Sequence, residues 1–234
     1  MPMRRTNFRT SIACLATVAL AIASGAAKAG RPSVTENADV IERGACEVEG
    51  VSASSRSSGN PSVRETVAIF TCAVGLDTQP AITYGRASAG GSREEGLLLG
   101  AKTMLRAPGE GRTGLGVVYA IGALKAAGSS WAREEASVTG LLTRELGPGL
   151  LGHANLGWSH SRAAGQSTTT WALGLEVPGD TVLAADVFGD DRGRPGASVG
   201  AGRTIGKVLL NAAYQMQFET PRVRQFSVGA KLTF

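Results

Sequence analysis

Two histidines, an asparagine and two serines lie close together in the stretch 153–161, and these residue types can support nucleophilic catalysis. A serine hydroxyl reacts only when an imidazole lies within hydrogen-bonding reach and a further group orients that ring. In an extended strand, successive side chains point to opposite faces, so His153 and Asn155 share one face while His160 lies on the other. We therefore expect no enzyme, and predict that His153 and Asn155 form a polar network with Glu176.

The elements that would position these residues are strands with two unlike faces. Apolar residues alternate with polar ones in segments of about ten residues, separated by turn residues such as Ala-Pro-Gly-Glu-Gly and Val-Pro-Gly-Asp. This pattern predicts twelve strands, near 45–54, 64–76, 80–89, 93–104, 113–124, 131–143, 149–161, 167–177, 180–189, 196–205, 207–218 and 223–234.

The first residues of the chain predict export. Residues 1–29 combine Arg4, Arg5 and Arg9 with a short apolar run and end on Ala-Lys-Ala, which is typical of a cleaved signal peptide. They contain four basic and no acidic residues, so cleavage lowers the net charge from +5 to about +1. The basic balance of the whole sequence is therefore no indication of a nucleic-acid partner.

The remaining residues are all-β and predict a transmembrane antiparallel β-barrel of about twelve strands (10–14) over 45–234, with 30–44 as an extended periplasmic lead-in. A soluble sandwich can also alternate. It would not be expected to end in apolar residues at every second position, as this chain does at Phe226, Val228, Ala230, Leu232 and Phe234. In a barrel these side chains face outer-membrane lipid, and closure pairs every backbone group.

An even number of strands places both termini on the periplasmic side of a Gram-negative outer membrane. The tight turns then fall on that side, and most of the longer polar connections fall outside. The C-terminal residues resemble the signal read by the outer-membrane barrel assembly machinery, which would be a partner of this chain. A monomer is expected.

The two cysteines that remain after cleavage test this topology. If the first hairpin folds about Gly59, Cys46 and Cys72 lie directly opposite each other. Because the periplasm is oxidising, we predict a disulfide between them. The alternatives are two unpaired buried thiols, or zinc, for which no matching His or Cys cluster is present.

Aromatic residues predict the lipid interfaces. A hairpin that turns around Ala164–Gly165 would place Trp158 opposite Trp171, both facing lipid near the outer interface. Trp131 and Phe218 are expected at the same level.

Two stretches resemble a known family. TENADVIERGACEVEG (35–50) shows an acidic–Ala, basic–Gly and Glu-x-Glu pattern at Asp39, Arg43, Gly44, Glu47 and Glu49. The stretch 152–178 carries His-x-Asn-x-Gly-aromatic and Gly-x-Glu patterns at His153, Asn155, Gly157, Trp158, Gly174 and Glu176. Both resemble the bacterial outer-membrane family assigned to transport in the meta-pathway of phenol degradation. The resemblance implies a small barrel and the uptake of hydrophobic or aromatic compounds.

The polar faces of the strands predict a lumen lined by charges of both signs. The candidates are Glu47, Glu49, Lys102, Arg133, Glu135, His153, Asn155, Glu176, Asp186, Lys207, Asn211, Gln215 and Lys231. Such residues either line a narrow channel for an unknown small solute or plug the barrel with salt bridges. A lipid-modifying enzyme is a third alternative, but the His-x-Ser-Asn motifs of outer-membrane phospholipases and lipid A deacylases are absent. No metal or cofactor is expected.

Overall fold

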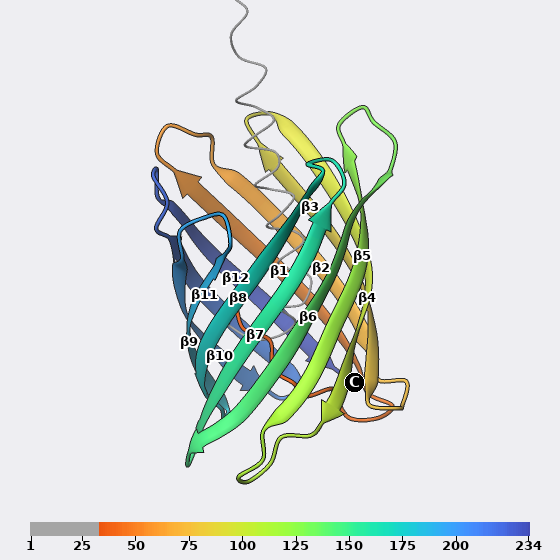
Figure 1. Cartoon of the computed structure of the whole chain (residues 1–234), viewed down its shortest axis with the longest axis vertical. Helices are drawn as coiled ribbons and strands as arrows, with labels where there is room; N and C mark the ends of the chain where they lie inside the picture. The colour runs from red at the N-terminus through yellow and green to blue at the C-terminus, as the bar shows by residue number, and fades with distance from the viewer. Residues whose placement is uncertain (1–32) are drawn as a thin grey trace, which may run out of the picture.

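The computed structural model describes residues 33–234. The predicted signal peptide, residues 1–29, and residues 30–32 lie outside the described part. Every strand pairs antiparallel with its neighbours, and β1 pairs with β12 to close a twelve-stranded barrel (Figure 1). The strands are β1 (Cys46–Ser57), β2 (Val63–Cys72), β3 (Thr78–Ala89), β4 (Ser92–Arg106), β5 (Gly114–Ala126), β6 (Ala132–Gly147), β7 (Leu150–Ser161), β8 (Gln166–Val177), β9 (Thr181–Asp190), β10 (Gly196–Ile205), β11 (Val208–Gln217) and β12 (Val223–Thr233).

The predicted number of strands is confirmed, and most boundaries agree within three residues. The second strand is shorter than expected and ends at Cys72, because the chain turns over residues 73–77. In this turn Leu76 and Asp77 both have positive φ, which does not fit a strand.

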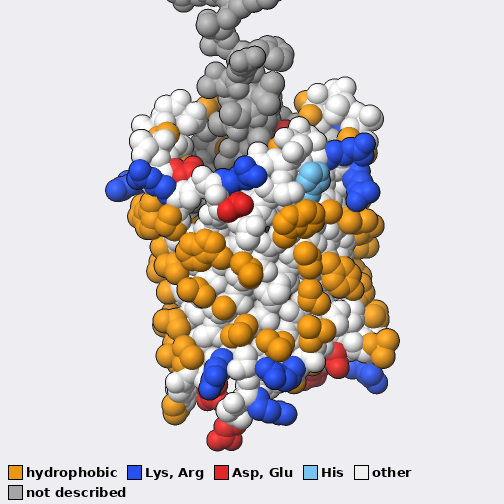
Figure 2. Space-filling view, in the orientation of Figure 1, with side chains coloured by type: hydrophobic (Ala, Val, Ile, Leu, Met, Phe, Trp, Pro, Cys, Tyr) orange, Lys and Arg blue, Asp and Glu red, His pale blue; other side chains and the backbone are white. Residues whose placement is uncertain are grey.

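The two faces of the barrel wall differ as the alternation predicts. In β12, every second side chain is exposed, and Phe226, Val228, Leu232 and Phe234 are between 41% and 55% exposed. Figure 2 shows hydrophobic side chains in a band around the visible face, between two ends that carry most of the charged side chains. An apolar outer band with charged ends is the surface expected of a strand barrel in a bilayer.

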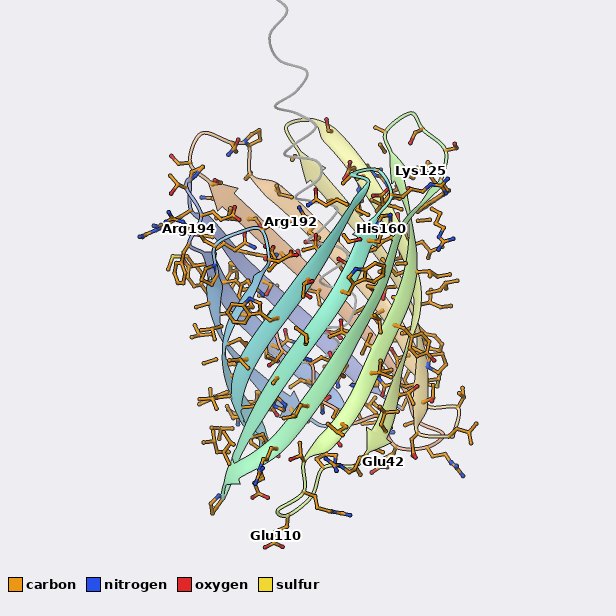
Figure 3. The ribbon with its side chains drawn as sticks, in the orientation of Figure 1. Glu42, Glu110, Lys125, His160, Arg192 and Arg194 are labelled. Atoms are coloured by element: carbon orange, nitrogen blue, oxygen red, sulfur yellow. A yellow bond between two sulfur atoms is a disulfide. The ribbon has the colours of Figure 1, made fainter. Side chains whose placement is uncertain are left out.

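The connections are short at both ends of the barrel. The longest, residues 107–113 between β4 and β5, lies at the end where β1 begins and the chain terminates (Figure 1). Figure 3 places Glu42 and Glu110 at this end and Lys125, His160, Arg192 and Arg194 at the other. Most connections of four or more residues do lie at the end away from the C-terminus, as expected, and residues 107–113 are an exception. Within residues 33–234, no helix is long and apolar enough to cross a membrane.

The predicted disulfide is confirmed. Cys46 and Cys72 are directly paired in the β1–β2 register, and their sulfur atoms are 2.06 Å apart. Cys46 also exchanges two backbone hydrogen bonds with Phe234, at 2.8 and 2.9 Å. The disulfide therefore ties β2 to the seam where the first and last strands meet.

Replacing both cysteines by serine is expected to destabilise the barrel by about 3 kcal/mol, because the cross-link no longer restricts the unfolded chain. Urea unfolding in detergent micelles measures this loss, and unheated gel migration shows whether the barrel still forms. An unchanged unfolding midpoint would contradict a stabilising role for the disulfide.

The predicted pairing of Trp158 with Trp171 is wrong. The β7–β8 hairpin turns one residue earlier than expected, so Trp171 pairs with Leu156 and Trp158 pairs with Thr169. Because this moves each partner by two positions, both tryptophans still lie on the outer face, 45% and 37% exposed. Trp131 and Phe218 are also exposed, at 43% and 37%.

Candidate channel lumen

The chain before β1 lies inside the barrel. Side chains from strands on different sides of the barrel all bond to residues 33–41, which places this segment in the lumen. We call residues 33–41 the lumen segment. The expectation that residues 30–44 form a periplasmic lead-in without structure of its own is wrong for this part. The error arose because only long-range contacts hold the segment.

Asp186 of β9 anchors the start of the lumen segment. Its carboxylate accepts hydrogen bonds from the backbone N–H groups of Val34 and Thr35, at 3.0 and 3.1 Å, and from the Thr35 hydroxyl at 2.6 Å. Ser198 of β10 donates a fourth bond to the same carboxylate at 2.8 Å. Asp186 is only 4% exposed, so these donors replace the water that a buried carboxylate loses.

The middle of the segment is bonded by β6 and β7. The Asn155 side chain accepts from the Glu36 N–H and donates to the Glu36 carbonyl, each at 3.1 Å. The Thr143 hydroxyl accepts from the Ala38 N–H at 2.9 Å and lies 3.0 Å from His153 Nδ1. Beyond them, the Gln79 side chain of β3 accepts from the Ile41 N–H at 2.8 Å.

A buried ion pair joins the segment to β4. Lys102 Nζ lies 2.7 Å from Glu36 Oε1 and donates to Asn37 Oδ1 at 3.2 Å. The two charged side chains are 9% and 10% exposed. A pair this buried is held in one geometry far more firmly than a surface pair.

Glycines give the segment room against the wall. A Cβ at Gly174 of β8 would lie 2.2 Å from Thr35 Oγ1, and a Cβ at Gly116 of β5 would lie 3.2 Å from the Ala38 carbonyl oxygen. Larger side chains at Gly174 would therefore collide with the lumen segment.

Most of the predicted lumen residues do face the interior. Those that are buried or partly buried on the inner face are Glu47, Glu49, Lys102, His153, Asn155, Glu176, Asp186, Asn211, Gln215 and Lys231, with Glu135 near the end opposite the termini. The predicted link between His153 and Glu176 is present as a 3.6 Å contact, and both side chains are at most 4% exposed. Asn155 bonds to Glu36 instead of completing a network with Glu176.

Two predicted lumen residues lie elsewhere. A register shift between β5 and β6 inserts Glu134, so Arg133 is exposed while Glu134 is buried. A bulge of this kind reverses the faces of all residues beyond it. Lys207 is exposed because it belongs to the turn between β10 and β11.

Sequence reasoning missed several residues that bond the lumen segment. Thr143 and Gln79, which bond the segment, and Ser198, which bonds Asp186, lie on the inner faces of their strands, so the alternation contained a signal for each of them. Glu36 and Asn37 gave no comparable signal, since they precede the first strand.

A hollow is present at the end of the barrel where β1 begins and the chain terminates. Its volume is about 520 Å³, and it is lined by Glu42, Thr204, Lys207, Lys231 and Phe234 among others. Lys231 Nζ is 2.9 Å from Glu47 Oε1, so this hollow leads from charged residues at the mouth to the inner face of β1 and β12. The lumen segment lies deeper inside.

The side chains that suggested catalysis are separated. His160 Nδ1 lies 3.1 Å from the Ser167 hydroxyl, and its ring stacks on Trp158 of the outer face. His153 instead contacts Thr143, which is 1% exposed and already bonded to Ala38. Among residues 33–234, no group of three or more His, Cys, Asp or Glu side chains is arranged to hold a metal ion.

The closed barrel with its apolar outer band and polar interior is an outer-membrane β-barrel. Residues 17–218 match the family described as uncharacterised conserved protein UCP029691, and the chain belongs to this family. A search of the curated proteins finds no match.

Several solved structures share the fold. The translocator domain of autotransporter NalP from Neisseria meningitidis aligns with a TM-score of 0.60 at 17% identity, over 96% of this chain and 98% of that one. The KdgM porin in complex with disordered oligogalacturonate gives 0.59 at 6% identity, over 80% and 99%. An outer membrane channel from Pseudomonas putida F1 gives 0.57 at 12% identity, over 84% and 97%. These likenesses support the broad class expected from the sequence, whereas membership of the phenol-degradation family stays a prediction.

Proposed function

We propose that the protein is an outer-membrane channel for small solutes whose lumen is closed by its own residues 33–41. The observation that carries this proposal is that the polar lumen is filled by a segment that is not part of the barrel wall. The described contacts between the segment and the wall are noncovalent, and a hollow at one mouth is lined by Glu42, the residue that follows the segment. Such a segment can close a pore and also leave it.

The lining residues indicate the class of solute. Carboxylates, ammonium groups and amides surround the lumen segment, and both signs of charge are present. This lining favours small polar solutes over the hydrophobic or aromatic compounds that the family resemblance implies, since an apolar solute gains little from a charged lining. Because the charges are mixed, strong selectivity for anions or cations is not expected.

A structural barrel without transport is the second candidate. The buried Lys102–Glu36 pair and the four bonds to Asp186 favour a permanently closed lumen. Swelling of reconstituted vesicles in a small neutral sugar separates the two candidates. The channel predicts swelling by the wild type above protein-free vesicles, whereas swelling only after displacement of the segment would support the structural barrel.

Gly174→Val displaces the segment without shortening the chain, because its side chain would occupy the position of Thr35. We expect this variant to swell vesicles several-fold faster than the wild type. Gly50→Ala is the matched control, since a Cβ at this strand glycine meets nothing within 4 Å. Equal rates for the wild type and both variants would contradict closure by the segment.

We also propose that the protein has no catalytic role. The Thr143 hydroxyl beside His153 already accepts a hydrogen bond from Ala38, and His160 contacts Ser167 on the outer face, so phospholipid is the substrate to test. Hydrolysis of phospholipid in reconstituted vesicles that is lost in Ser167→Ala would contradict this proposal.

Assembly is proposed to depend on the last residue. Phe234 is 55% exposed, and its backbone closes the seam with Cys46. Deletion of Phe234 is expected to reduce the amount of folded barrel in the outer membrane strongly, as measured by the heat-dependent shift in gel migration. Phe218→Ala, at an exposed aromatic near the opposite end, is the control and should assemble normally.

A further inference from the structure

The lumen binds its own segment largely through the main chain. Four wall side chains accept from backbone N–H groups: Asp186 from Val34 and Thr35, Asn155 from Glu36, Thr143 from Ala38, and Gln79 from Ile41. Asn155 also donates to the Glu36 carbonyl. These backbone groups are present in every peptide, so the same contacts are available to chains of other sequence.

Side-chain selection includes three consecutive residues of the segment. The Thr35 hydroxyl donates to Asp186, and Lys102 contacts both Glu36 and Asn37. The wall residue opposite this part is Gly174, which leaves room for the segment because even a Cβ there would collide with Thr35. The preferred ligand therefore carries a hydroxyl residue followed by an acidic residue and an amide.

We propose that the lumen is a binding site for an extended acidic peptide, of which residues 33–41 are the resident ligand. A peptide with a Thr-Glu-Asn core competes for the same contacts once the resident segment leaves. The hollow of about 520 Å³ supplies the entrance; Lys207 and Glu42 lie in its lining, and Lys231 is paired there with Glu47. The inference rests on the proposed function in one respect, that the segment can leave the lumen.

Binding can be measured independently of conduction. The protein is the full chain with residues 33–41 replaced by a proline sequence of equal length, which keeps the connection to β1 but offers the wall no backbone N–H groups. The probe is a fluorescently labelled synthetic peptide with the sequence of residues 33–41, Ser-Val-Thr-Glu-Asn-Ala-Asp-Val-Ile. Saturable binding is expected by fluorescence anisotropy in micelles, together with block of any current that the variant carries.

Two modified peptides test the mode of recognition. N-methylation at the Thr35 amide removes one donor to Asp186 and keeps every side chain, so affinity should fall about tenfold or more. A peptide with lysine in place of Glu36 should also bind more weakly, because it meets Lys102. The same peptide with an acetylated N-terminus is the control and should bind unchanged, since the described contacts with the wall begin at Val34 N.

A folded variant that binds no peptide, or that binds the N-methylated peptide equally well, would overturn the inference. Gel migration before and after boiling establishes that the variant is folded. If the replacement variant does not fold, the labelled peptide is tested on the full-length Glu36→Lys protein, in which Lys102 repels the resident segment. A variant that binds the peptide but carries no current would contradict the proposed channel function and still support the peptide-binding site.

Discussion

Replacement of Asp186 by alanine is expected to release the start of the lumen segment and to raise the ion current through the barrel. The carboxylate accepts two backbone and two hydroxyl hydrogen bonds, and three of these four come from Val34 and Thr35. Removing a buried charged acceptor of this kind costs on the order of 3 kcal/mol. A loss of that size lowers the ratio of closed to open barrels on the order of a hundredfold.

The control is Asp180→Ala, which removes an exposed carboxylate from the β8–β9 turn. Current is recorded in planar bilayers for both variants. An Asp186→Ala barrel that stays as closed as the Asp180→Ala barrel would show that Asp186 does not hold the segment.

Lys102→Met is expected to have a comparable effect through a different contact. It leaves the Glu36 carboxylate without its cation at a site where both groups are about nine-tenths buried. Breaking a buried ion pair from one side costs about 3–5 kcal/mol, with the lower end expected where water can enter the lumen. Glu36 should then leave the lumen, and a glutamate-specific protease should cleave after Glu36 as readily as after the exposed Glu42.

In the double variant Lys102→Met, Glu36→Gln, neither side chain of the pair is charged, so the segment should regain much of its place in the lumen. Together with the single variants it forms a double-mutant cycle, which measures the coupling between the two side chains. Lys125→Met is the matched control. Lys125 is 41% exposed at the far end of the barrel and lies 3.9 Å from Glu95, so its loss should change little (Figure 3). Equal protease protection in Lys102→Met and Lys125→Met would contradict a role for the ion pair in closure.

The barrel wall could be predicted because each strand has one face towards lipid and one towards the lumen. Because of this constraint, apolar and polar residues alternate in nearly every strand. The short turn at Gly59 then determined the pairing of Cys46 with Cys72. The same reasoning failed where the chain departs from regular pairing. The bulge at Glu134 exposed Arg133, and the β7–β8 turn moved Trp158 and Trp171 out of register.

The candidate site was predictable only in part. Four site residues could be predicted because they occupy the polar, inner-face positions of alternating strands: His153, Asn155, Glu176 and Asp186. The lumen segment carries no such pattern, because its neighbours are side chains more than a hundred residues away along the chain, such as Asp186 and Thr143. Long-range contacts of this kind leave no local period in a single sequence.

Single-barrel current recording tests whether residues 33–41 close a conducting lumen. The variant lacking residues 33–41 is compared with the wild type at the same voltage and salt concentration, after both have shown the heat-dependent gel shift of a folded barrel. We expect a steady current in the variant and a much smaller or only brief current in the wild type. Equal currents in the two proteins would contradict closure by this segment.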